Sequence, residues 1–220
     1  MRKTWFAAAL VAVAVVVIAG TALLGRTTNT AAAAGGASPR IFVAISGQKQ
    51  GAISGDVPAS PAFSPSIANQ IEVYGLTHSV VMPVDPQSGL PTGQRQHKPI
   101  TLRLAWSKAS IPLYEALTDN ENLRHVTITF YEPYARGAAT LYRQYAKIVL
   151  TNAVIVSMSE EVPPAGARIE ANPADPAADH FQHQEVLTLV YQQIEWSSIV
   201  GGKVISAMDD WERPTASPNK

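Results

Sequence analysis

The stretch VTITFY, residues 126–131, alternates apolar side chains with threonine and tyrosine. Successive side chains on an extended strand point to opposite faces, so this pattern predicts a β-strand. We expect Val126, Ile128 and Phe130 to face a core, and Tyr131 to face outward with the threonines. A strand of this kind, repeated along the chain, determines the expected fold.

Five other segments have strand character. Alternation recurs in IEVYGLTH, residues 71–78, and in TLRLAW, residues 101–106, where Trp106 is expected to face the core with the leucines. The remaining candidates are an apolar run at Ile41 to Ile45, a β-branched run at Tyr142 to Met158 that fits one bent strand or two, and Val186 to Trp196 as the last clear strand.

One segment breaks the strand pattern. SIPLYEALTDN, Ser110 to Asn120, predicts a short helix in which Leu113, Tyr114 and Leu117 share one face. Ser110 is a suitable cap, and Pro112 is tolerated in the first turn. A mainly antiparallel β chain with one short helix implies a barrel or a sandwich with the helix at its side or end.

The composition is that of a globular protein. The chain has 220 residues, of which 46% are hydrophobic and 15% charged, and this length allows a sizeable core in one domain. Seventeen basic and seventeen acidic residues cancel, so bulk charge gives no case for binding nucleic acid. Cysteine is absent, which excludes disulfides, thiol nucleophiles and cysteine-bound metals.

The N-terminus carries a leader. Residues 1–25 comprise a basic start and an uncharged apolar run at residues 5–24, which fits either a cleaved signal peptide or a retained transmembrane anchor. Either form predicts an exported body, periplasmic or secreted, or anchored to the inner membrane by residues 5–24. Residues 26–39 then read as a flexible linker, 40–212 as the folded domain and 213–220 as a disordered tail.

A search for catalytic patterns returns none. The chain has no G-x-S-x-G elbow and no P-loop lysine. His180 and His183 have a ligand-like spacing but no obvious third ligand, so solvated loop histidines are the favoured interpretation. The adjacent pairs Glu160-Glu161 and Asp209-Asp210 fit solvated or salt-bridged roles. We therefore predict no catalytic, cofactor-binding or metal-binding residues, and no enzyme activity.

The loop HSVVMPVDPQSGLPTGQRQHKPI, residues 78–100, is unusually long. Loops above about 12–15 residues are uncommon and are usually functional or disordered. The loop ends in a cationic cluster, Arg95 to Lys98, for which two interpretations remain. The cluster is either a solvated start of the next strand, or an interface where Arg95 binds a carboxylate or carbonyl of another chain.

Several separated stretches resemble one family. They are IFVAISGQKQGAISGDV near the start of the body, the long loop itself, SIPLYEAL, VYQQIEW, and GGKVISAMDDW at the end. Together they are similar to the Hcp (haemolysin-coregulated protein) family of type VI secretion. The resemblance implies a squat antiparallel β-barrel of two packed sheets with one short helix. It also implies hexameric rings that stack into a secreted tube, with a VgrG-like spike, a sheath and small effectors in the lumen as partners, and no catalysis.

The resemblance gives the long loop a role. Residues Met82 to Pro99 would form an arm that joins neighbouring protomers or rings, with prolines that stiffen it and glycines that permit its turns. The expected assembly residues are Pro83, Asp85, Gly89, Gly93, Arg95, His97 and Lys98. The C-terminal stretch that matches the family contains Gly201, Gly202, Asp209, Asp210 and Trp211.

Two features depart from the family pattern. The run before the helix, Ser107 to Pro112, lacks the acidic residue that usually opens it, so an ion pair made by that residue is not expected. Ordinary members also carry no apolar leader. The alternative hypothesis is therefore an exported or membrane-anchored Hcp-like binding module that does not form a tube.

Overall fold

The computed structural model describes residues 37–162 and 183–210. The predicted leader, the predicted tail at 213–220 and most of the predicted linker lie outside these residues, as do His180 and Trp211. Within 37–162 and 183–210, no helix is long and apolar enough to cross a membrane. The domain boundaries stay a prediction.

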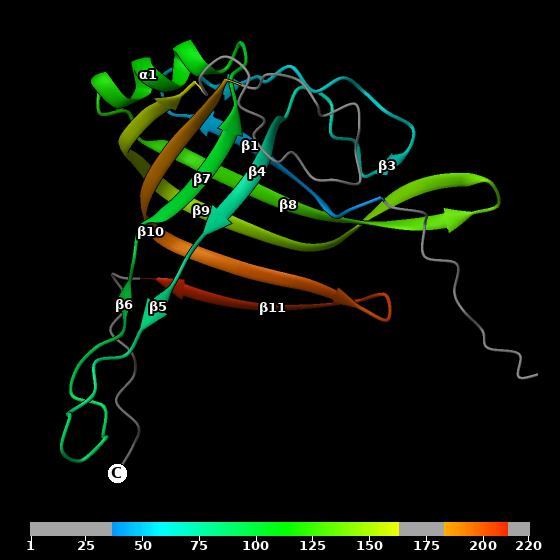
Figure 1. Ribbon diagram of the computed structural model, residues 1–220. Helices are drawn as coiled ribbons and strands as arrows, with labels where there is room; N and C mark the ends of the chain where they lie inside the picture. Colours follow the sequence, from blue (N-terminus) through cyan, green and yellow to red (C-terminus); the bar gives the residue numbers. More distant parts are fainter. Residues whose placement is uncertain (1–36, 163–182, 211–220) are drawn as a thin grey trace, which may run out of the picture. The chain divides into compact units, whose positions relative to one another are not determined.

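The described chain is mainly β-structure with one helix, as the sequence predicts (Figure 1). Its elements are β1 Arg40–Gly47, β2 Ala52–Ile53, β3 Phe63–Ser64, β4 Ile71–Thr77, β5 Val80–Val81, β6 Gln96–His97, β7 Ile100–Ala105, α1 Ser110–Thr118, β8 Leu123–Arg136, β9 Ala139–Glu161, β10 Gln184–Val200 and β11 Lys203–Asp210.

The strands close into a barrel because β10 has neighbours on both sides. Neighbouring strands follow the order β10, β7, β4, β1, β8 and β9, and β9 pairs again with β10. Every pairing in this circuit is antiparallel. Beyond the end of β7, the second half of β10 pairs instead with β11, which is the outermost strand. The predicted antiparallel barrel is thus confirmed.

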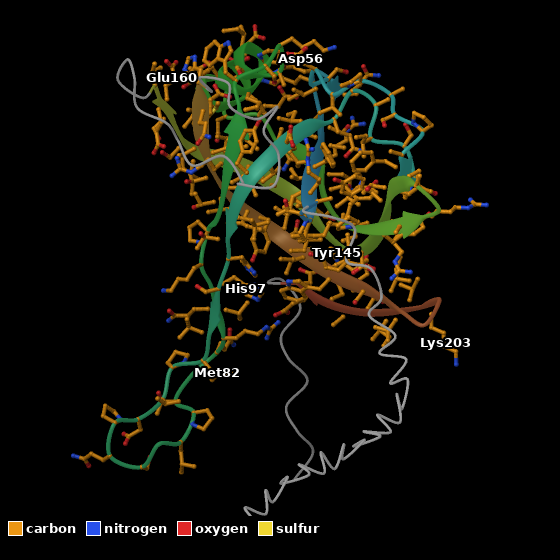
Figure 2. The ribbon with its side chains drawn as sticks, turned by 45° about the vertical axis from the view of Figure 1, so that its right-hand side comes forward. Asp56, Met82, His97, Tyr145, Glu160 and Lys203 are labelled. Atoms are coloured by element: carbon orange, nitrogen blue, oxygen red, sulfur yellow. The ribbon has the colours of Figure 1, made fainter. Side chains whose placement is uncertain are left out.

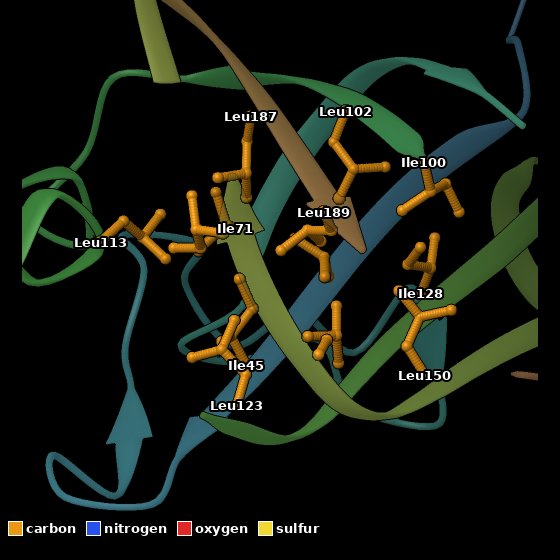
Figure 3. Close-up of a cluster of buried hydrophobic side chains, with 14 of the residues drawn as sticks. Ile45, Ile71, Ile100, Leu102, Leu113, Leu123, Ile128, Leu150, Leu187 and Leu189 are labelled. Carbon is orange, nitrogen blue, oxygen red and sulfur yellow. The ribbon is translucent and has the colours of Figure 1, made fainter. Parts of the chain in front are cut away.

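The barrel interior is an apolar core (Figure 3). The alternation at residues 101–106 is confirmed for Leu102 and Leu104, which are fully buried, and Val126 and Ile128 are buried with them. Full burial of such a side chain contributes about 1.5–3 kcal/mol. Trp106, which was expected to face the core, is instead 39% exposed, because it lies just beyond the end of β7.

A second apolar cluster lies on the opposite face of β8. Phe42, Ile67 and Tyr131 are buried there, and Phe63 and Tyr142 stack on each other with ring centroids 4.4 Å apart. Tyr131 thus points away from the barrel interior, as the alternation predicts, but it is buried there and not exposed to solvent. The loop that carries Phe63 and Ile67 covers this face, and the Tyr131 hydroxyl donates to the carbonyl of Pro65 at 3.1 Å.

The long apolar run after the helix forms one strand. Strand β9 continues from Ala139 to Glu161, and Asn152 has a left-handed φ of 51° within it, so the bent-strand alternative holds. Val186 to Trp196 is indeed a strand, but it is not the last one, because β11 follows it. The sequence reading missed β11, in which Val204, Ile205 and Met208 are exposed.

The predicted helix is present, but its predicted cap is not. Helix α1 begins at Ser110, and the residue at its N-cap is Ala109, which makes no side-chain cap hydrogen bond. Ser110 is buried, and its hydroxyl donates to Glu185 at 2.9 Å. Leu113 packs in the core, as the predicted face requires.

Candidate assembly site

The long loop is an ordered hairpin that projects from the barrel. Strands β5 and β6 pair antiparallel, and Val84 forms a further bridge with Pro91. Figure 2 shows His97 near the barrel, where the arm begins, and Met82 farther out, with the loop at the tip of the arm beyond it. We call residues 79–98 the arm, because the backbone N–H of Lys98 donates to the carbonyl of Ser79 at its base.

The tip of the arm is held by a turn around Asp85. Its side-chain Oδ1 accepts the backbone N–H groups of Gln87 and Ser88, both at 2.8 Å. These bonds, Ser88 first, lower the pKa of the Asp85 carboxyl below its usual value. Gly89 follows with a φ of 69°, so the predicted role of this glycine in a turn is confirmed.

Gly93 differs from Gly89. It is not among the glycines with positive φ, and a Cβ at this position would meet only Pro83 Cγ, at 3.9 Å. The chain bends at Gly93 without a positive φ, so the role predicted for this glycine in a turn stays a prediction. The arm exposes a row of apolar side chains, and Leu90 at its tip is 65% exposed. The other exposed members are Val80, Val81, Met82 and Val84.

The cationic cluster at the base of the arm is divided between two environments. Arg95 binds the Asp209 carboxylate of its own chain through Nε and Nη2, and His97 Nε2 lies 2.8 Å from Asp209 Oδ2. His97 is 8% exposed, whereas Lys98 is exposed and its ammonium group donates to Gln96 Oε1 at 3.3 Å. The structure thus adds a third arrangement, an in-chain ion pair, to the two predicted for this cluster.

Asp209 therefore connects the C-terminal strand to the arm. The hydrogen bond from Arg95 lowers the pKa of Asp209 to about 2, against the opposing effect of burial. The adjacent Asp210 ends β11, and Gly201 and Gly202, with φ of 58° and 79°, form the turn between β10 and β11. The predicted salt-bridged role of the acidic pair is confirmed for Asp209.

Two residues at the arm base were missed by the sequence reading. Tyr191 on β10 places its hydroxyl 2.7 Å from His78 Nε2 and 3.0 Å from His97 Nδ1. Trp196, also on β10, stacks against the His97 ring at 6.1 Å between centroids. Tyr191 lies in a predicted strand, but nothing in its local pattern indicates a polar contact with residues 94 and 113 positions away.

The remaining candidates for a catalytic or metal-binding role make contacts with neighbouring side chains of the fold. Glu161 binds Arg103, which confirms the salt-bridged role for this residue of the pair, and Glu160 lies 3.5 Å from His183 Nε2. The His183 ring stacks on Trp106 with centroids 4.2 Å apart. Within residues 37–162 and 183–210, no group of three histidine or acidic side chains has the geometry of a metal site.

The comparison with protein families then places the chain. Residues 36–197 match the family model described as "Type VI secretion system effector, Hcp". The chain belongs to the Hcp family. A curated relative, the "Major exported protein" of Pseudomonas aeruginosa, is 35% identical over 179 residues, which cover 80% of this chain and 96% of that protein.

Solved structures agree with this assignment. A crystal structure of an Hcp protein has a TM-score of 0.61 and 27% identity, and covers 80% of this chain and all of that one. The secreted protein Hcp3 from Pseudomonas aeruginosa has a TM-score of 0.55 and 28% identity over the same shares. An Hcp1 from E. coli, with a TM-score of 0.62 and 23% identity, covers 78% of this chain and 98% of its own, and supports the fold alone.

Proposed function

We propose that this Hcp protein is a non-enzymatic structural subunit that assembles into hexameric rings, which stack into the secreted inner tube of a type VI apparatus. The family match over residues 36–197 carries this proposal. A tube of this kind implies a VgrG-like spike and a sheath as partners, and a lumen that holds small effectors. The name of the Pseudomonas relative, "Major exported protein", supports export.

Strand β11 offers a surface for ring formation. It lies at one end of the strand order, and its backbone pairs only with β10 among the described strands. Val204 is 67% exposed, and Ile205 lines an apolar groove together with Phe130 and Trp196. A long exposed edge with apolar side chains favours association with another chain, and a ring covers such an edge in every copy.

The arm offers a separate surface for stacking. Its exposed apolar side chains lie away from the barrel, and its turn at Asp85 is already ordered in the single chain. Ordering before contact lowers the entropy lost on docking. We assign Pro83, Asp85, Gly89 and Lys98 to this contact, whereas Arg95 and His97 orient the arm from its base.

The alternative is an exported or membrane-anchored binding module that keeps the fold without forming a tube. The apolar run at residues 5–24, which precedes the family match, is the observation that favours it. A cleaved leader would give a periplasmic or secreted body, and a retained one an anchored body. N-terminal sequencing of the protein recovered from cells separates these two forms.

The test is electron microscopy with native mass spectrometry on the protein purified after expression of the full chain. We expect six-fold rings and short stacks of rings. Deletion of Gln87 to Gly93 is expected to leave the rings and abolish the stacks, while Ala138→Ser, at the exposed turn between β8 and β9, leaves both. A monomer at all concentrations would support the binding module, and normal stacks from the deletion variant would refute the role of the arm.

A further inference from the structure

A continuous chain of hydrogen-bonding groups crosses the base of the arm. It runs from His78, just after β4, through the Tyr191 hydroxyl on β10 to His97 on β6, and ends at Asp209 on β11. The three contacts measure 2.7, 3.0 and 2.8 Å. We call these four residues the latch. The latch ties the arm to two strands of the barrel domain that lie far away in the sequence.

The directions of these hydrogen bonds follow from the acceptor at one end. Ionised Asp209 can only accept, so His97 must donate to it from Nε2. A neutral His97 then accepts at Nδ1, which requires the Tyr191 hydroxyl to donate there. The Tyr191 oxygen is left to accept from His78 Nε2. With both histidines neutral, every contact of the latch therefore joins a donor to an acceptor.

One added proton can be accommodated. If it binds His97, Nδ1 becomes a donor, the Tyr191 hydroxyl turns toward His78, and His78 accepts at Nε2 in its other neutral tautomer. If it binds His78, the original directions hold. A second proton puts two imidazolium donors on the same phenol oxygen, with ring centroids only 6.3 Å apart. Like charges at that separation repel, and the hydroxyl proton can point at neither ring.

We propose that Tyr191 and Asp209 are positioning residues for the arm, and that the latch they form holds the arm when no more than one of its histidines is protonated and releases it when both are. The importance of the arm for stacking rests on the proposed function. The latch itself is a property of the single chain.

The surrounding charges favour release in mildly acidic solution. Burial and the neighbouring His97 lower the pKa of His78 below 6.5. His78 therefore takes up its proton at a lower pH in the latched state than in the released state. The latch is thus fully stable above pH 6.5 and weakens as the pH falls below it. Each unit of difference in pKa changes the ratio of latched to released arm tenfold.

Asp209 and Tyr191 keep their charge state over that range. Arg95 holds Asp209 ionised down to a pKa of about 2, and burial raises the pKa of Tyr191, so its hydroxyl stays protonated. Beside the latch, the exposed Lys98 lies on the arm and Asp210 ends β11.

Hydrogen exchange in the arm tests the proposal on unstacked protein made from the full chain. After correction for intrinsic exchange rates, we expect protection of the Gln96 and Lys98 amides, which lie in the hydrogen-bonded pairs of the hairpin, to fall between pH 7.5 and pH 5. Tyr191→Phe and Asp209→Asn are expected to lower protection at pH 7.5 and to flatten the pH profile. Glu132→Gln, which removes an exposed ion pair with Arg143, is the control and keeps the wild-type profile.

His78→Gln separates the latch from a merely structural contact. A glutamine amide can donate to Tyr191 but takes up no proton, so the arm should stay protected at pH 5. A flat wild-type profile, or a wild-type pH dependence in His78→Gln, would overturn the proposal even if Tyr191→Phe failed to fold. If rings form but protection of the arm does not depend on pH, the latch is refuted and the proposed function stands. If protection depends on pH as expected but no rings form, only the proposed function is refuted.

Discussion

Gly47 lies against the buried carboxylate of Glu121. A Cβ built on Gly47 would stand 2.4 Å from Glu121 Oε1, closer than real Cβ atoms approach. Glu121 is 2% exposed and accepts the backbone N–H groups of Lys49 at 2.6 Å and Gln50 at 3.0 Å. Gly47→Ala must therefore displace Glu121 and break the bonds that shape the turn after β1.

The magnitude follows from those bonds. A hydrogen bond to a charged group contributes about 1.5–3 kcal/mol, so losing two costs about 3–6 kcal/mol of unfolding free energy. Glu121→Ala removes the same bonds and should cost about as much. In Gly47→Ala/Glu121→Ala the clash is gone and the bonds are lost once, so the double variant should resemble either single variant.

Urea unfolding followed by tryptophan fluorescence, at one protein concentration and pH 7, measures these changes. Gly75→Ala is the control, because its Cβ would meet only Arg103 Cβ at an ordinary 3.6 Å and should change stability by less than about 0.5 kcal/mol. The reasoning is refuted if the losses of unfolding free energy in the two single variants add up in the double variant. It is also refuted if Gly47→Ala is as stable as the control.

The same site makes a prediction about acid. Burial raises the pKa of Glu121, but the hydrogen bonds from Gln50 and Lys49 outweigh it and the pKa lies below 4.5. A lowered pKa in the folded state adds stability above the unfolded value of 4.5, which is lost as the pH falls below it. Glu121→Ala should therefore show a shallower loss of stability in acid than wild type, and an identical slope would contradict this assignment.

Three further changes test the packing. Ser110→Ala removes the hydroxyl that donates to buried Glu185 and should cost about 1–3 kcal/mol in urea unfolding, with Ser110→Thr as the conservative comparison. Tyr131→Phe should cost about 1 kcal/mol, because the bond to the Pro65 carbonyl is lost and the ring stays, and no change would argue against that bond. Leu102→Ala should cost about 2–5 kcal/mol, and a thermal midpoint near wild type would place Leu102 outside the core.

The barrel was predictable because its signal is local. Alternation over a few residues identifies Leu102 and Leu104 as core residues without knowledge of their neighbours. Tyr131 obeys the same alternation and is nevertheless buried, because the loop that covers it comes from residues near Pro65, 66 positions earlier. A strand pattern shows which residues share a face, but only the complete fold shows that both faces are covered.

At the start of the helix, the local sequence likewise fails to predict the contact that one residue makes. The spacing of apolar residues predicts the extent of α1, since the helical face is also a local feature. Ser110 at its start has the chemistry of a cap, yet its hydroxyl bonds to Glu185, 75 residues away. A serine at a helix start can satisfy a backbone group or a distant side chain, and the sequence around it is compatible with both.

The arm base is the least predictable part, because its contacts are the most distant. The sequence presents Arg95 to Lys98 as one cationic cluster, but Arg95 meets Asp209 across 114 positions while Lys98 stays exposed. The family resemblance locates the arm but not this division. Because the charge of Arg95 is neutralised within the chain, Lys98 is the cation left exposed at the arm base, and the proposed latch makes its orientation depend on β11. If the arm stacks rings as proposed, a change in the C-terminal strand therefore alters stacking without touching the stacking surface.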